Sequence, residues 1–145
     1  MTRSKAKASD AMRRELTPEQ YNVCFLKGTE PPFSGKYTDN KEPGTYACVV
    51  CGAELFSSDS KFDSRTGWPS FDRPVASKGI AYEDDYSLGM HRIEVMCKSC
   101  GSHLGHVFDD GPTETGKRYC INSLALHFTP KGKASPVEAK NLIRI

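Results

Sequence analysis

Cys120 lies in the segment 118–122, RYCIN, and is not one of a closely spaced cysteine pair. If this segment is a strand, alternate residues share a face, so Arg118 and Asn122 project beside the sulfur while the residues between them point into apolar packing. A cation beside a thiol lowers the thiol pKa and favours the thiolate. The pattern predicts a nucleophilic cysteine. Taken alone, it also fits an ordinary solvated strand face with a small cysteine in it.

Two histidines precede this segment, His103 and His106. Imidazole can hold or release a proton near neutral pH, and a pair directly after a candidate metal-binding turn indicates an acid/base role, although a lone histidine is usually structural. A regular strand would place the two rings on opposite faces. Bringing both into one pocket assumes that Gly105 kinks or bulges the chain.

The single tryptophan, Trp68, stands in the segment 67–71, GWPSF, at the end of a loop predicted over 62–71. An aromatic ring in a Gly/Pro loop is poorly placed for a core. It could form a lid over an apolar pocket, with Phe71 or Phe108 as another wall. The alternative is a surface loop anchored by its one large aromatic side chain.

Four further cysteines, Cys48, Cys51, Cys97 and Cys100, form two Cys-x-x-Cys pairs. Each pair is followed by Gly-x-x-Leu, the pattern of a zinc knuckle, in which glycine lets the chain leave a tight turn. Four thiolates satisfy tetrahedral zinc and leave no open position, so the sequence predicts one structural zinc ion. Two disulfides, an iron–sulfur site and redox-active pairs are alternatives. His103 could replace a ligand, although four cysteines suffice.

The chain that must position these residues has 145 residues, 37% of them hydrophobic, with 12 glycines and 9 prolines. That composition fits one loop-rich, mainly β domain with a lean core that a metal can staple. We expect a disordered basic tail over 1–16, a domain over 17–130 and a polar tail over 131–145. The segments read as strands are 45–47, 92–96, 118–122 and 123–128.

One helix is predicted from Thr17 to about Lys27. Thr17 can cap it, Pro18 fits its first position, and Gln20 completes a capping box. Cys24, the remaining cysteine, lies on this helix.

The net charge of +2 gives no reason to expect nucleic acid or an anionic membrane as a partner. No apolar run reaches membrane-spanning length, and the first 16 residues lack the apolar segment of a secretory signal. Cysteine pairs that hold a metal suit a reducing compartment. We therefore expect a cytoplasmic protein, with a monomer as the default state.

The motifs together resemble those of the B-type peptide methionine-(R)-sulfoxide reductases. The matching segments stand in the family's order and spacing and cover roughly 17–128: GTEPPFSG at 28–35, both cysteine pairs, GWPSF at 67–71, HLGHVF at 103–108 and RYCIN at 118–122. The resemblance implies a β-tent fold of two antiparallel sheets with short peripheral helices and a structural zinc.

The resemblance also implies roles for individual residues. Cys120 corresponds to the nucleophile, which attacks the electrophilic sulfoxide sulfur and becomes a sulfenic acid. Trp68 corresponds to the tryptophan that receives the substrate methyl group, and Arg118 to the arginine near the nucleophile. The residues implied to bind the sulfoxide oxygen, position water and supply protons are His103, His106 and Asn122. Thioredoxin is the implied reductant of the resulting disulfide.

One position departs from the family pattern. Many members carry a resolving cysteine just before GWPSF, where this chain has Arg65 and Thr66. We expect Cys24 to resolve the sulfenic acid instead, which requires its helix to lie near the active site or to swing to it. Direct attack by an external thiol is the alternative.

Two other classes fit parts of the sequence. A zinc-ribbon binding module would explain the cysteine pairs, but it predicts a basic face and gives Cys120 no task. A zinc hydrolase or deaminase needs an open coordination position, which four thiolates do not leave.

Overall fold

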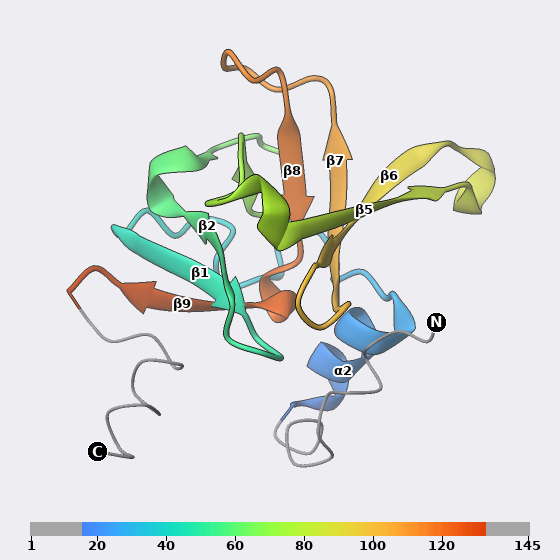
Figure 1. The fold of residues 1–145 in the computed structure, drawn as a ribbon, viewed down its shortest axis with the longest axis horizontal. Helices are drawn as coiled ribbons and strands as arrows, with labels where there is room; N and C mark the ends of the chain where they lie inside the picture. Colours follow the sequence, from blue (N-terminus) through green and yellow to red (C-terminus); the bar gives the residue numbers. More distant parts are fainter. Residues whose placement is uncertain (1–15, 133–145) are drawn as a thin grey trace.

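The computed structural model describes residues 16–132, which fold into two antiparallel sheets with one α-helix beside them (Figure 1). The smaller sheet has the strand order β2-β1-β9, and the larger has the order β3-β4-β8-β7-β6-β5. The elements are α2 (Pro18–Leu26), β1 (Gly44–Cys48), β2 (Glu54–Ser57), β3 (Lys61–Phe62), β4 (Ser70–Phe71), β5 (Ile80–Asp85), β6 (Arg92–Cys97), β7 (His103–Phe108), β8 (Arg118–Ile121) and β9 (Leu126–Pro130), with short 3₁₀ turns η2 (Ser58–Ser60), η3 (Ser77–Gly79), η4 (Ser87–Gly89) and η5 (Ser123–Ala125). The predicted mainly β fold with two antiparallel sheets is confirmed.

Helix α2 begins with the predicted capping box. The backbone N–H of Gln20 donates to the Thr17 hydroxyl at 3.1 Å, and the Thr17 N–H donates to the Gln20 side-chain oxygen at 2.9 Å. The helix ends one residue earlier than expected, because Lys27 takes a left-handed conformation with φ of 62° and its N–H returns to the Asn22 carbonyl. The helix packs against β7 and η5.

Aromatic rings join the two sheets. Phe56 of β2 stacks on Phe71 of β4, with ring centroids 4.5 Å apart, and Tyr46 of β1 meets Phe71 edge to face at 5.2 Å. All three side chains are fully buried. Because aromatic burial stabilises a core strongly for its residue count, a composition with few aliphatic residues still gives a packed interior.

The larger sheet places Cys120 between two other strands. Cys120 on β8 pairs with Ser70 of β4 on one side and with His106 of β7 on the other. The segment 67–71 and the segment 103–108, distant in sequence, therefore both border the strand that carries the candidate nucleophile.

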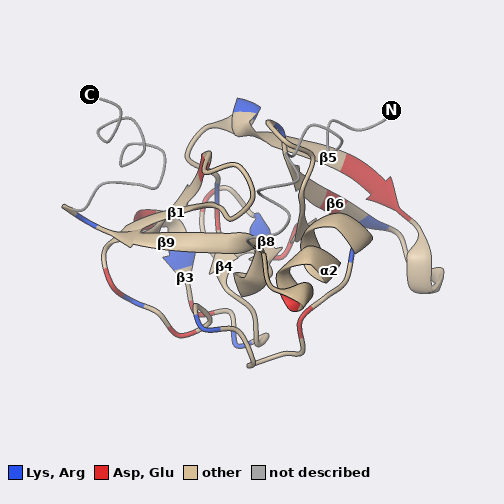
Figure 2. Cartoon of the chain, turned by 90° about the horizontal axis from the view of Figure 1, so that it is seen from below, with Lys and Arg blue, Asp and Glu red and all other residues tan. Residues whose placement is uncertain are grey.

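The exposed edge of the larger sheet is acidic. Figure 2 shows red acidic residues along β5, whose last residues are Glu83, Asp84 and Asp85. Charges on an edge strand oppose pairing with a strand of another molecule.

Two local predictions are wrong. The segment 123–128 is not one strand, since η5 occupies Ser123–Ala125 before β9 begins. The cause is tertiary: the Glu30 carboxylate accepts the backbone N–H groups of Ser123 and Leu124, which holds a turn there. The segment read as a plain loop over 62–71 also contains the short strands β3 and β4 at its ends.

The predicted tails fall almost wholly on residues 1–15 and 133–145, which lie outside the described residues. Within the described part of the chain, no helix is long and apolar enough to cross a membrane.

Candidate active site and metal centre

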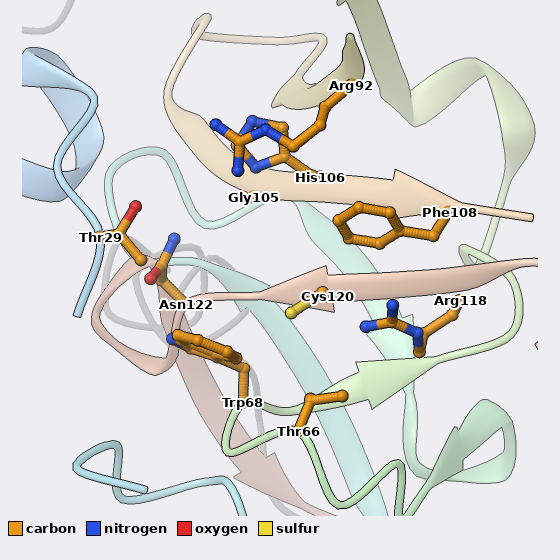
Figure 3. A pocket seen from close by; sticks show the side chains of 10 residues that line it. All are labelled: Thr29, Thr66, Trp68, Arg92, Gly105, His106, Phe108, Arg118, Cys120 and Asn122. Carbon is orange, nitrogen blue, oxygen red and sulfur yellow. The ribbon is translucent and has the colours of Figure 1, made fainter. Parts of the chain in front are cut away.

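A cavity of about 260 Å³ opens beside Cys120, between β7, β8 and the loop that leads into β4 (Figure 3). Its wall combines aromatic, cationic and hydrogen-bonding groups. The lining residues are Thr29, Thr66, Trp68, Arg92, Gly105, His106, Phe108, Arg118, Cys120 and Asn122. Six of the predicted site residues thus share one cavity.

The alternation predicted for β8 is present. Arg118, Cys120 and Asn122 line the cavity, whereas Tyr119 and Ile121 are buried in the core. Burial raises the pKa of the Cys120 thiol, and the Arg118 charge and a hydrogen bond from Thr66 only partly offset this. The net pKa shift is therefore opposite to the one expected from Arg118 alone, and the resting group is a thiol.

Arg118 is held in place by two contacts. Its Nε and Nη2 atoms donate to the two Asp110 carboxylate oxygens at 2.8 and 3.0 Å. Its guanidinium carbon lies 4.4 Å from the centroid of the Phe108 ring. A planar guanidinium fixed by a bidentate pair and an aromatic face keeps its charge beside Cys120 with little freedom.

The irregularity assumed in the histidine strand exists, one residue before Gly105. The pairing of β6 with β7 shifts between Val95 and Met96, so that Leu104 is an extra residue in β7. His103 and His106, which a regular strand would separate, come within 5.6 Å between ring centroids. Only His106 of the two lines the cavity.

His106 is paired with an acid. Its Nε2 atom lies 2.7 Å from Asp85, whose pKa this contact lowers. Burial lowers the pKa of His106, and Arg92 and His103 lower it further, against the opposing effect of Asp85. The ring is therefore mostly neutral at neutral pH. With Nε2–H donating to Asp85, Nδ1 is the nitrogen left to accept a proton.

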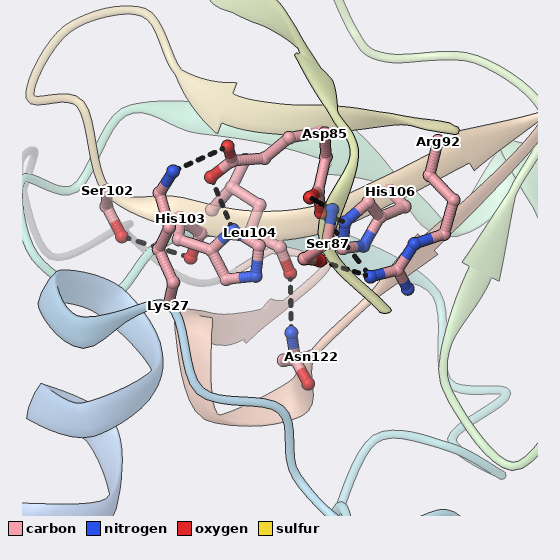
Figure 4. A network of polar contacts seen from close by, with 10 residues as sticks. Lys27, Asp85, Ser87, Arg92, Ser102, His103, Leu104, His106 and Asn122 are labelled. Carbon is pink, nitrogen blue, oxygen red and sulfur yellow. Dashed lines mark hydrogen bonds and ion pairs between the residues drawn. The ribbon is translucent and has the colours of Figure 1, made fainter. Parts of the chain in front are cut away.

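His103 does not line the cavity and belongs to a chain of polar contacts that runs from the buried Glu94 to the exposed Lys27 (Figure 4). Its Nδ1 atom is 2.7 Å from Glu94, and Lys27 approaches the other Glu94 oxygen at 3.2 Å. Glu94 is only 2% exposed, yet its pKa is lowered, because His103 and Lys27 outweigh the effect of burial. The His103 Nε2 atom is buried and finds no hydrogen-bond partner among the described residues.

Trp68 and Asn122 are both held by backbone groups. The Trp68 indole N–H donates to the Glu30 carbonyl at 2.9 Å. The Asn122 amide accepts from the Glu30 N–H at 3.0 Å and donates to the Leu104 carbonyl at 3.0 Å. These two hydrogen bonds fix the orientation of the Asn122 amide, with its oxygen towards Glu30 and its nitrogen towards Leu104.

Cys24 does not line the cavity. It is 2% exposed on α2, and its surroundings include Cys97, the last residue of β6, and Ser102, directly before β7. Burial raises its pKa to about 11, despite a hydrogen bond from Ser102. In this conformation Cys24 is a packed thiol.

The four paired cysteines lie close enough together to hold a metal ion. The Cys48 and Cys100 sulfurs are 3.7 Å apart, the Cys51 and Cys97 sulfurs are 3.6 Å apart, and all four lie within 4.8 Å of one another. Ligands about 2.3 Å from a tetrahedral zinc stand about 3.8 Å from each other. The donor set fits zinc, and the separations are too long for disulfides.

Both halves of the centre are built alike, as the repeat predicts. The Gly52 N–H donates to the Cys48 carbonyl and the Gly101 N–H donates to the Cys97 carbonyl, each at 2.8 Å. The two glycines have φ of 83° and 80°, a conformation that other residues adopt only under strain.

Sequence reasoning missed several residues of the site. Thr66 and Arg92 line the cavity, and Asp85 and Glu94 hold the two histidines. The position of Thr66 directly before GWPSF is a usable signal. Asp85 and Glu94 carry none, since their partners lie in other strands.

Comparison with known proteins agrees with this geometry. Residues 16–130 match the SelR domain. The chain is 59% identical over 119 residues to "Methionine-R-sulfoxide reductase B3, mitochondrial" of Mus musculus, a match that covers 82% of this chain and 47% of that protein. It is 58% identical over 122 residues to "Peptide methionine sulfoxide reductase MsrB" of Methanosarcina barkeri, covering 84% of this chain and 86% of that protein. A Pseudomonas aeruginosa MsrB of strain PAO1 is 54% identical over 125 residues, with coverage of 86% and 95%.

These matches define the class of protein. The chain is an oxidoreductase of the SelR type. It belongs to the family of B-type methionine-R-sulfoxide reductases.

Proposed function

We propose that this chain reduces methionine-R-sulfoxide, in proteins and also as the free amino acid, with Cys120 as the nucleophile. The observation that carries the proposal is a free thiol in a cavity walled by Trp68, His106 and Asn122. The names of the relatives support the substrate. A zinc-ribbon binding module would have no use for this cavity.

In the proposed reaction, the Cys120 sulfur attacks the sulfoxide sulfur and the substrate oxygen passes to the enzyme. Cys120–SH and the sulfoxide become Cys120–SOH and the sulfide. The substrate sulfur gains two electrons and the cysteine sulfur loses them. The thiol supplies the proton that ends on the transferred oxygen, so no external proton is consumed in this step.

The surrounding residues have distinct tasks in this scheme. His106 takes the Cys120 proton at Nδ1 and returns it to the sulfoxide oxygen, which Asn122 helps to orient. His103 supports that proton path from behind, through its contact with the His106 ring. Arg118 stabilises the sulfur as it becomes anionic. Trp68 and Phe108 enclose the apolar substituents of the sulfoxide, the methyl group against Trp68.

For the next step we propose that Cys24 attacks the Cys120 sulfenic acid, which releases water and leaves a Cys24–Cys120 disulfide. This route requires α2 to leave its place against β7 and η5, since Cys24 is buried there. Thioredoxin then reduces the disulfide by thiol exchange. The alternative route is direct reduction of the sulfenic acid by an external thiol through the open cavity.

Mass spectrometry after oxidation by substrate, without reductant, separates the two routes. The Cys24 route predicts a crosslinked peptide pair that is absent in Cys24→Ser. A lasting sulfenic acid at Cys120, trapped by dimedone in the unmodified chain, would reject it.

The remaining parts of the proposal concern the molecule as a whole. Zinc bound by Cys48, Cys51, Cys97 and Cys100 supplies a structural crosslink. We propose that the protein acts as a monomer in the cytoplasm, on oxidised protein methionine, without nucleic acid or membrane as a partner.

Turnover of both epimers of a methionine sulfoxide peptide with dithiothreitol tests the main proposal. The R epimer is expected to be reduced and the S epimer to remain. Cys120→Ser should abolish turnover while zinc content and circular dichroism stay unchanged. Cys24→Ser is the matched control and should remain active with dithiothreitol. An inactive unmodified chain, or an active Cys120→Ser variant, would sink the proposal.

A further inference from the structure

Glu30 is a buried acid without a task in the scheme above. Its side chain is 3% exposed, yet it has no cationic partner within the described ion pairs. Its two carboxylate oxygens instead accept the backbone N–H groups of Ser123, at 2.9 Å, and Leu124, at 3.0 Å. Burying a carboxylate costs desolvation free energy, which these two charge-assisted hydrogen bonds offset. The Glu30 side chain thereby stabilises the turn that directly follows Asn122.

The main chain of the same residue reaches both polar groups at one end of the cavity. The Glu30 N–H donates to the Asn122 side-chain oxygen at 3.0 Å, and the Glu30 carbonyl accepts the Trp68 indole N–H at 2.9 Å. Figure 3 shows Asn122 and Trp68 together on one side of Cys120, with Arg118 on the other. One residue thus contacts two cavity residues and the turn that follows β8.

We propose that Glu30 is a positioning residue for sulfoxide reduction. Its carboxylate binds the backbone of the 122–124 turn and so fixes the position of the Glu30 main chain. The Glu30 N–H then orients the Asn122 amide, and the Glu30 carbonyl orients the Trp68 indole. The inference rests on the proposed function of the cavity. In this proposal the Glu30 side chain affects the geometry of the bound substrate through Asn122 and Trp68, without touching the substrate itself.

Two further observations support this arrangement. A Cβ atom on Gly35 would collide with a Glu30 carboxylate oxygen and with the Ser123 hydroxyl. Glycine at position 35 therefore leaves room for the Glu30 carboxylate to reach the turn. Burial raises the pKa of Glu30, while the backbone N–H groups of Ser123 and Leu124 oppose this effect, and the ionised carboxylate contributes to raising the pKa of Cys120.

The single tryptophan makes the proposal directly observable. In a ¹H–¹⁵N spectrum of the zinc-loaded chain, Trp68 gives the one indole N–H resonance, and its hydrogen bond to Glu30 should protect it from exchange. Glu30→Ala should shift that resonance towards the position of a free indole, speed its exchange, raise KM and lower kcat/KM by ~10-fold to 100-fold. Glu30→Gln keeps the length and one acceptor, so it should fall between Glu30→Ala and the unmodified chain.

The matched control is Glu54→Gln, which removes an exposed carboxylate from β2 in the other sheet and should change none of these values. Glu30→Gln should also lower the pH midpoint of Cys120 alkylation, since it removes a nearby negative charge. A purely structural role would lower the unfolding temperature but leave the indole resonance, KM and the alkylation midpoint of the folded protein as they were. That result would overturn the proposal.

Gly35→Ala perturbs Glu30 without altering it and should reproduce the indole shift. If Glu30→Ala yields no folded protein, an unchanged indole resonance with unchanged KM in both Glu30→Gln and Gly35→Ala overturns the proposal. The spectrum is recorded without substrate. An unmodified chain that is inactive on the R epimer therefore rejects the proposed function, independently of whether the indole resonance moves.

Discussion

The Cys120 sulfur is subject to opposing influences. Burial favours the neutral thiol, while Arg118 and Thr66 favour the thiolate, and burial prevails. A nucleophile that stays protonated until its proton has an acceptor is protected from oxidants that attack thiolates. The neutral His106 ring beside it is suited to be that acceptor.

Alkylation of Cys120 by iodoacetamide should therefore rise with pH through a midpoint above the ordinary pKa of cysteine, about 8.5. Arg118→Ala removes a lowering influence, so its midpoint should move higher still and its rate at pH 7 should fall several-fold. Lys117→Ala, the exposed neighbour, is the control. A midpoint that falls in Arg118→Ala would contradict the assigned direction.

Much of the cavity could be predicted from single residues. The alternation of the segment 118–122 correctly places Arg118 and Asn122 with Cys120, and Trp68 and Phe108 also reach the cavity. The burial of Cys24 and the polar chain behind His103 could not be predicted, because both depend on which strands and helix become neighbours. Side-chain pairing across strands leaves no local sequence pattern.

At the scale of elements, β7 is the strand whose irregularity shapes the site. The extra residue at Leu104 turns His103 to the same side as His106, and Gly105 lies against the backbone of β8. Gly105 has no positive φ, so its role is close approach and not an unusual conformation.

Gly105→Ala should consequently destabilise the protein by about 1–3 kcal/mol, since its Cβ would meet the Cys120 carbonyl and force the two strands apart. Turnover should fall as Cys120 shifts. Gly79→Ala is the matched control, because nothing lies near its added methyl group, and it should stay within about 0.5 kcal/mol. Urea denaturation measures both, and equal midpoints for the two variants would refute the argument.

Thr17→Ala tests whether α2 can release Cys24. Loss of the cap should cost about 1 kcal/mol of local stability, which raises the open population roughly fivefold and with it the labelling rate of Cys24. The crosslink to Cys120 should form faster by a similar factor. The control is Thr113→Ala, in a distant exposed turn, which should leave both rates unchanged. If Cys24 is labelled equally fast in Thr17→Ala and in the unmodified chain, opening of α2 does not expose Cys24.

Element boundaries were predictable where the signal is local. The capping box of α2 and the strand leading into each cysteine pair follow from neighbouring residues. The turn η5 does not, because it is fixed by a carboxylate more than ninety residues earlier. Nor does β5, whose acidic end has low strand propensity and is held by pairing with β6.

At the scale of the whole molecule, the metal centre joins the two sheets. Cys48 ends β1 in the smaller sheet and Cys97 ends β6 in the larger one. An ion bound there would add a crosslink between the sheets to the short chain connections through η2 and η5, and its binding free energy would become folding free energy.

Removal of zinc by a strong chelator should lower the unfolding temperature by at least about 10 °C, with one zinc released per chain. Cys51→Ser should purify with less metal and show a similar loss, whereas Cys120→Ser should match the unmodified chain. Metal analysis with thermal unfolding measures both. An unfolding temperature that survives complete zinc loss would refute the stapling role.

The sulfur atoms of the four paired cysteines can be oxidised, as the sulfur of methionine can. Oxidants that convert methionine to its sulfoxide also attack thiolates, and each zinc ligand lost this way would weaken the proposed crosslink between the sheets. Oxidation that reached these ligands would loosen the frame of the enzyme itself, so the reducing capacity of its surroundings would also determine how long the enzyme stays folded.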